Sequence, residues 1–170
     1  MMNTTTLKLY RLGYGEVKTY LFAAAFAIGN IGLPQLFHLV PQGGVTWLPI
    51  YFFTLTGAYK YGWKVGLLTA LLSPVLNHLL FGMPALGVLH VIVIKSSLLA
   101  LAAGFAARRY HRVSIPILVG VVPAYQVGGT LAEWGVDGRF LTAVQDHRIF
   151  SQAMPLQVNG GYLAIRLGFR

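Results

Sequence analysis

The stretch "GVLHVIVIKSSLLALAAGFAARR", residues 87–109, decides how this chain must fold. It is long and apolar enough to cross a bilayer, because a membrane-spanning helix needs about 20 mostly apolar residues. One lysine, Lys95, lies near its middle. A cation at that depth costs on the order of 3 kcal/mol or more. The reason for its presence must therefore be sought in the polar groups that the rest of the chain brings to the same depth.

The overall composition also indicates a membrane protein. Of the 170 residues, 56% are hydrophobic and only 10% are charged, whereas a soluble domain carries about 25% charged residues. So few charges cannot cover a surface that faces water. The sequence predicts an all-α, multi-pass integral membrane protein with a single transmembrane domain over residues 1–170. The absence of cysteine excludes disulfides and thiol chemistry.

Apolar segments separated by glycine, proline and charge clusters indicate a six-helix bundle. The helices are predicted at residues 17–33, 46–59, 65–80, 86–107, 113–132 and 149–167. The connection "GLPQLFHLVPQGGVTW", residues 32–47, is too apolar for a solvated loop, and we expect it to fold back onto the bundle. The basic and then apolar N-terminus could also be a signal peptide, but it lacks a tidy small-residue cleavage site. We interpret it as a retained first helix.

The lysines and arginines predict the orientation. Arg139 and Arg148 fall outside and Lys95 stays in the membrane, so ten of the 13 cations lie on the cytoplasmic side if the N-terminus is inside. These ten are Lys8, Arg11, Lys18, Lys60, Lys64, Arg108, Arg109, Arg112, Arg166 and Arg170. An excess of cations in short loops marks the cytoplasmic side. Both termini are therefore predicted to be cytoplasmic.

Amides, imidazoles and the lysine gather in the outer half of the predicted bundle. At about 1.5 Å per residue, Lys95 lies about 13 Å below the outer end of its helix. The inner halves carry hydroxyls, which can bond back to the helix backbone. This pattern indicates a polar pocket that opens outward above an apolar floor, with Lys95 at its bottom. The candidate substrate-binding residues are Gln35, His38, Asn77, His90, Lys95, Gln126, Gln157 and Asn159.

Each of these residues also has a structural explanation. Lys95 could snorkel, or pair with Glu133 or Asp146. The histidines and amides of the helices could form helix–helix hydrogen bonds, which are common in membranes. Gln35 and His38 could be wetted loop residues. The sequence leaves these alternatives open, and the asymmetry of the whole set favours a pocket more than any single residue does.

The sequence contains no recognisable catalytic, nucleotide-binding or metal-binding motif. There is no HExxH, no GxSxG, no phosphate-binding glycine loop and no carboxylate pair at helical spacing. The five histidines do not have the spacing of metal ligands. We therefore expect neither an enzyme nor a bound metal or cofactor. Without a nucleotide site, any energy for transport must come from a partner.

The first helix offers a possible docking surface. Within "YLFAAAFAIGN", residues 20–30, Ala23 and Ala27 are four residues apart. Small residues at this spacing allow a second helix to approach closely. The spacing predicts either a partner-docking face or packing within the same chain.

The chain resembles the substrate-binding S components of energy-coupling factor (ECF) vitamin transporters. The resemblance covers about residues 18–167 and is clearest in "WLPIYFFTLTGAYKYGWKVGLLTALLSPVLNHLLFGMPAL" and in "MPLQVNGGYLAIR". That family has six helices, both ends inside, a long first loop and a small-residue motif on the first helix. The similarity is one of pattern rather than of fixed catalytic letters.

The resemblance implies a high-affinity binder of a small water-soluble vitamin or related micronutrient. It would work with an ECF coupling transmembrane subunit and two ATPase subunits of an ABC-type importer, in a bacterial or archaeal cytoplasmic membrane. The family's docking motif would correspond to Ala23 and Ala27. Its ligand contacts would fall near Gln35, His38, Lys95, Gln126, Gln157 and Asn159.

The resemblance leaves the nutrient open. Metal-transporting members carry a histidine after the initiator methionine, whereas Met2 and Asn3 follow here, so nickel and cobalt are disfavoured. A buried Lys95 without an acid nearby in sequence suggests a carboxylate or phosphate on the ligand. The competing hypothesis is a small structural or assembly membrane protein that has no soluble ligand.

Overall fold

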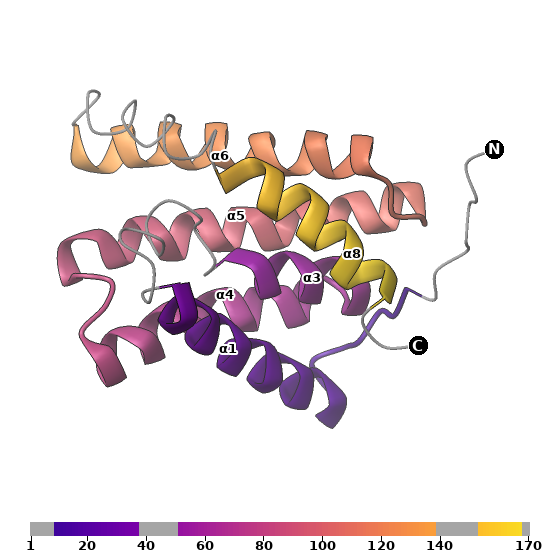
Figure 1. Ribbon diagram of the computed structural model, residues 1–170, viewed down its shortest axis with the longest axis horizontal. Coiled ribbons are helices and arrows are strands. Elements are labelled where there is room, and N and C mark those ends of the chain that lie inside the picture. The colour runs from indigo at the N-terminus through magenta and orange to yellow at the C-terminus, as the bar shows by residue number, and fades with distance from the viewer. Residues whose placement is uncertain (1–8, 38–50, 139–152, 168–170) are drawn as a thin grey trace.

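The computed structural model describes residues 9–37, 51–138 and 153–167, which contain helices and no strand (Figure 1). The elements are α1 (Val17–Phe37), α3 (Phe52–Tyr61), α4 (Trp63–Phe81), α5 (Leu86–Tyr110) and α6 (Ile115–Asp137). A π-helical turn, η2 (Leu156–Gly160), then continues into α8 (Gly161–Leu167). The predicted all-helical class is confirmed for these residues.

Four of the helical stretches are long and apolar enough to cross a membrane: Val17–Leu36, Trp63–Phe81, Leu86–Tyr110 and Ile115–Gly135. Their outward faces carry large apolar side chains, and Leu79, Phe105 and Leu86 are each about 70% exposed. A soluble monomer rarely exposes so many large apolar side chains on its helices, whereas lipid tails would cover them. The structure therefore has the features of a multi-pass membrane protein.

The predicted count of six spanning helices is matched only in part. Four predicted segments correspond to α1, α4, α5 and α6. The second predicted helix is represented by α3, which has only ten residues and is about 15 Å long at 1.5 Å per residue. Residues 46–50 and 149–152 of the second and sixth predicted helices lie outside the described residues.

The short helix α3 lies at the centre of the bundle, where it contacts α1, α4, α5 and α8. Every residue from Thr54 to Tyr61 is buried. In Figure 1, α4, α5 and α6 run nearly alongside one another, while α1 and α8 cross them obliquely. Short links join α4 to α5 and α5 to α6, so these neighbours are antiparallel. This arrangement gives the bundle two distinct ends.

We define the two ends by the helix termini that they hold. The polar end, at the left of Figure 1, holds the carboxyl ends of α4 and α6 and the start of α5; the basic end, at the right, holds the start of α4 and the carboxyl ends of α5 and α8. The charge pattern predicts that the polar end is extracellular and the basic end cytoplasmic.

Candidate functional site: a buried polar core

Buried polar side chains of several helices meet inside the bundle, and we call this group the polar core. Its centre is Asn30 on α1, which is 0% exposed and was not among the predicted site residues. Its Nδ2 donates to Thr54 Oγ1 at 2.9 Å and to Ser73 Oγ at 3.2 Å, and its Oδ1 accepts from the Phe53 amide at 3.0 Å. These bonds join α1, α3 and α4. A fully bonded side chain of this kind fixes how the three helices align.

The network continues into α5. Thr54 Oγ1 and Ser96 Oγ lie 3.4 Å apart. The sequence pattern predicted that hydroxyls such as these bond back to their own helices. Thr56 and Thr69 do so, through Phe52 O at 3.1 Å and Val65 O at 2.9 Å. Thr54 and Ser96 instead bond across helices, because Thr54 accepts from Asn30 of α1 and its hydroxyl also lies within hydrogen-bond distance of Ser96 on α5.

Lys95 forms a buried ion pair with Glu133, with 2.8 Å between Nζ and Oε2. The two side chains are 3% and 8% exposed. The acid comes from α6, 38 residues further along the chain. Of the alternatives left open by the sequence, pairing with Glu133 is therefore the one observed, and Asp146 lies outside the described residues.

A glycine makes room for the lysine stem. If Gly129 carried a Cβ atom, that atom would clash with Cγ of Lys95. Gly129 and Glu133 are four residues apart on α6, so they share one face of the helix. The lysine stem therefore crosses α6 at Gly129 and its ammonium reaches Glu133 one turn further along.

The same face of α6 carries two more polar residues, Gln126 and Thr130. Next to Gln126, Tyr125 donates from its hydroxyl to Gln157 Oε1 at 2.9 Å, which ties α6 to η2. Gln157 lies in a π-helical turn, a feature that often accompanies functional sites because it displaces side chains from regular helix positions. The polar core thus extends from α1 across α3, α4, α5 and α6 to η2.

Four buried side-chain atoms have no hydrogen-bond partner within the part of the chain that the structure describes. They are Gln35 Nε2, Asn77 Oδ1, Thr130 Oγ1 and Gln157 Nε2. Gln35, Asn77 and Thr130 all lie within about 10 Å of the carboxyl ends of α1, α4 and α6. Buried polar atoms are nearly always bonded, so each of these needs a partner that the described residues do not supply.

Apolar side chains make up most of the buried interior in the basic half, although Lys60, at the end of α3, is buried there as well. The apolar side chains include Ala58, Leu99, Ala103, Leu118, Val122 and Ile165, each 0% exposed. These residues belong to the main hydrophobic cluster. They form an apolar floor beneath the polar core.

The predicted binding residues separate into three groups. Asn77, Lys95, Gln126 and Gln157 are buried within the bundle, and Gln35 is half-buried. His90 and Asn159 are exposed, so the interior does not hold them. His38 lies outside the described residues. The structure thus joins part of the predicted set to residues that the sequence did not indicate, chiefly Asn30 and Tyr125.

The alanines predicted to form a docking surface face inward. Ala23 and Ala27 are 1% and 2% exposed. Ala23 packs with Phe26, Tyr61 and Val65. Ala23, Ala27 and Asn30 lie on one face of α1, at positions i, i+4 and i+7. Their spacing therefore serves packing within the chain, and a partner helix cannot reach this pair.

A cavity of about 240 Å³ lies at the basic end, among residues 9–13, 62–64 and 104–111. None of the predicted substrate-binding residues lines it. Within the described ranges, no group of three or more His, Cys, Asp or Glu residues could hold a metal ion.

No protein-family model, no curated protein and no solved structure matches this chain. The geometry described above is therefore the only basis for the fold and the site.

Proposed function

We propose that this chain is a membrane-embedded substrate-binding protein that captures a small polar solute at the polar end of the bundle. The observation that carries the proposal is a set of four buried atoms without a hydrogen-bond partner among the described residues, on Gln35, Asn77, Thr130 and Gln157. Leaving a buried polar group unbonded costs about 1–3 kcal/mol. A solute that bonds these atoms would recover that free energy on binding.

The unpartnered atoms define the chemistry of the solute. The Nε2 groups of Gln35 and Gln157 need acceptors, Asn77 Oδ1 needs a donor, and Thr130 Oγ1 can serve in either role. The ion pair with Glu133 already compensates the charge of Lys95. The reason for expecting an anionic ligand therefore falls away. A neutral or zwitterionic solute that carries both donors and acceptors fits better, which includes several kinds of vitamin.

The resemblance to ECF S components supplies the rest of the proposal. The chain would deliver its solute inward with a separate coupling subunit and two ATPases, in the cytoplasmic membrane of a bacterium or archaeon. A coupling subunit would have to dock on the outward face of α1. That face exposes Ala24, Ala25 and Ile28, whereas Ala23 and Ala27 are buried.

Two steps test the proposal. First, the protein is purified in mild detergent and any co-bound small molecule is identified by mass spectrometry. Second, a panel of vitamins and related solutes is screened by thermal shift. A ligand at a hundred times its Kd adds about 2.7 kcal/mol, which corresponds to about 5–10 °C for a chain of this size.

A matched pair of variants then locates the site. Thr130→Val and Thr69→Val remove the same hydroxyl, but Thr130 Oγ1 has no partner in the described residues whereas Thr69 Oγ1 bonds to Val65 O. We expect Thr130→Val to abolish most of the ligand-induced shift and Thr69→Val to leave it intact. Equal shifts in the two variants would rule out a site at the polar core.

The second candidate is a structural or assembly membrane protein without a soluble ligand. The Lys95–Glu133 pair favours it, because the pair accounts for the buried lysine without any solute. This candidate predicts no co-purified compound and no response to the panel. It also predicts that Thr130→Val, which removes an unbonded hydroxyl, raises the melting temperature of the purified protein.

A further inference from the structure

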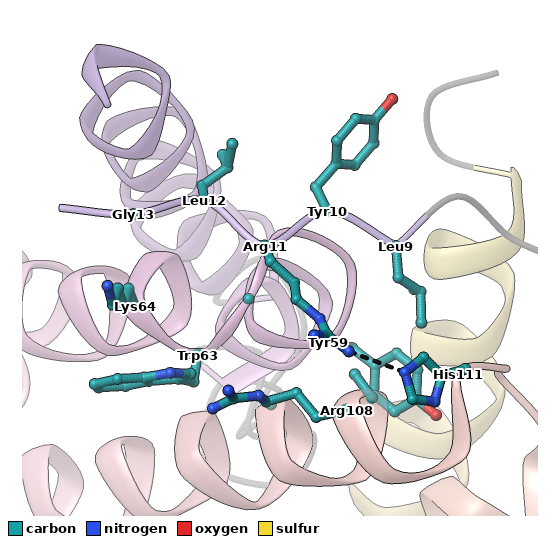
Figure 2. Close-up of a pocket in the computed structure, with 13 residues that line it drawn as sticks. Leu9, Tyr10, Arg11, Leu12, Gly13, Tyr59, Trp63, Lys64, Arg108 and His111 are labelled. Carbon is teal, nitrogen blue, oxygen red and sulfur yellow. Dashed lines mark hydrogen bonds between the residues drawn. The ribbon is translucent and has the colours of Figure 1, made fainter. Parts of the chain in front are cut away.

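The cavity at the basic end is built by an N-terminal strap, residues 9–13, that crosses the ends of three helices (Figure 2). Two backbone hydrogen bonds hold the strap to the end of α3: Tyr10 N to Lys60 O at 2.8 Å and Leu12 N to Tyr61 O at 3.2 Å. The opposite walls come from the start of α4 and the last turns of α5. The strap therefore encloses a space of about 240 Å³ at the predicted cytoplasmic interface.

Three cations line this space, and each is placed differently. Arg11 donates from Nη2 to His111 Nε2 at 2.9 Å. Lys64 Nζ lies 4.8 Å from the centre of the Tyr14 ring. Arg108 is exposed, and within the described residues it has no hydrogen-bond or ion-pair partner. The cavity thus holds a cation that is free to bind an external anion.

The surrounding charges do not cancel these cations. The nearby acid is Glu16, whose Oε1 accepts a hydrogen bond from the Gly13 amide at 2.8 Å. A further cation, Lys60, lies behind the strap at the end of α3 and is 4% exposed. Burial lowers the pKa of its ammonium. Even without Lys60, the three lining cations outnumber the one carboxylate found nearby among the described residues, so the space favours an anion.

An apolar groove adjoins the basic cavity. The groove has a volume of about 290 Å³ and is lined by Trp63, Leu101, Phe105 and Arg108. Leu101 and Phe105 are 45% and 70% exposed, on the face that lipid would cover. Trp63 and Arg108 line both spaces. In Figure 2 their side chains extend together, away from the Arg11–His111 bond.

A glycine brings the two spaces together. A Cβ atom on Gly104 would clash with Cβ of Trp63 and would lie 2.9 Å from its Cα. This position on α5 must therefore be glycine for α4 to cross it so closely. The crossing places the Trp63 indole between the basic cavity and the apolar groove.

We propose that this composite surface binds an anionic phospholipid of the cytoplasmic leaflet. The lipid phosphate would lie among Arg11, Lys64 and Arg108, and one acyl chain would follow Leu101 and Phe105. Basic pockets between membrane helices on the cytoplasmic side suit anionic headgroups, and tryptophan favours this depth of the interface. A soluble phosphate ester would leave the apolar groove unused, which is why a lipid fits better. The proposal does not depend on the proposed solute site.

The test is native mass spectrometry of the full chain with added phosphatidylglycerol or phosphatidylcholine. We expect discrete adducts with phosphatidylglycerol and few with phosphatidylcholine. Arg108→Gln should lower the abundance of the phosphatidylglycerol adduct by about fivefold, because one interfacial cation contributes about 1 kcal/mol to lipid binding. Arg109→Gln is the matched control, since Arg109 is exposed on the same helix turn but lines neither space. It should leave the adduct nearly unchanged.

Three results would overturn the proposal. Equal binding of the two lipids would exclude recognition of an anion. Equal losses in the two arginine variants would indicate diffuse surface charge. Displacement of the lipid by millimolar inorganic phosphate, together with full binding by Phe105→Ser, would indicate a soluble anion site. Phe105 is largely exposed, so its replacement should not prevent folding, and the lipid proposal requires Phe105→Ser to weaken binding.

Discussion

Replacing Lys95 with methionine is the most direct test of the buried ion pair. Methionine keeps most of the volume of the stem but removes the ammonium, so the carboxylate of Glu133 would remain in the interior without its cation. The prediction is a large loss of stability in Lys95→Met, a similar loss in Glu133→Gln, and a partial recovery in the double variant.

The magnitude follows from the geometry. Two unit charges 2.8 Å apart attract by about 6 kcal/mol at an effective dielectric constant of 20. Desolvation of both groups offsets much of this attraction, so the pair itself contributes little net stability. Removing one partner, however, leaves an uncompensated charge and costs about 3–5 kcal/mol. For a chain of this size that loss lowers the melting temperature by about 10 °C.

The assay is thermal unfolding in detergent, with each single variant compared with Lys95→Met/Glu133→Gln. The double variant should recover at least half of the loss of either single variant, because it buries no unpaired charge. Leu99→Ala serves as a reference for an ordinary core defect, since Leu99 is 0% exposed on the same helix and its truncation costs about 2–5 kcal/mol without involving charge.

Two outcomes would refute this reasoning. If Lys95→Met melted at the temperature of the parent protein, the lysine could not be the compensating partner of a buried carboxylate. If the double variant were less stable than both single variants, the two residues would contribute independently and the observed distance would have no energetic meaning.

Three further predictions concern packing, the polar network and orientation. Gly129→Ala should cost about 1–3 kcal/mol in thermal unfolding, because its methyl would clash with the lysine stem. Gly128→Ala, which meets only an ordinary contact, should cost nothing, and equal effects would contradict the packing. Asn30→Leu should cost about 1–3 kcal/mol, because it removes three hydrogen bonds and leaves the Phe53 amide and the Ser73 hydroxyl without this partner, so an unchanged melting temperature would argue against the network. Since the chain has no cysteine, Met83→Cys and Arg109→Cys can be labelled singly. An impermeant maleimide on intact cells should modify only the former, and the reverse pattern would invert the orientation.

Much of the site could not be predicted from the sequence, and Glu133 shows why. Glu133 lies 38 residues from Lys95, and no local pattern joins them. The sequence indicates Glu133 only as one of two acids that could pair with Lys95. The packing of α5 against α6 through Gly129 selects it. Asn30 did carry a signal, because it continues the face marked by Ala23 and Ala27. A polar residue on a small-residue face indicates an interior rather than a docking surface.

The sequence by itself determined the helical class and the apolar segments that can cross a membrane. These properties follow from composition and periodicity, which act within a single segment. Only the tertiary structure decided which polar groups meet, that Ala23 and Ala27 face inward, and that a basic cavity adjoins an apolar groove beside Trp63. Such contacts depend on how helices far apart in the chain cross. Those crossings are set by interior volumes and by single glycines, which leave no periodic trace in the sequence.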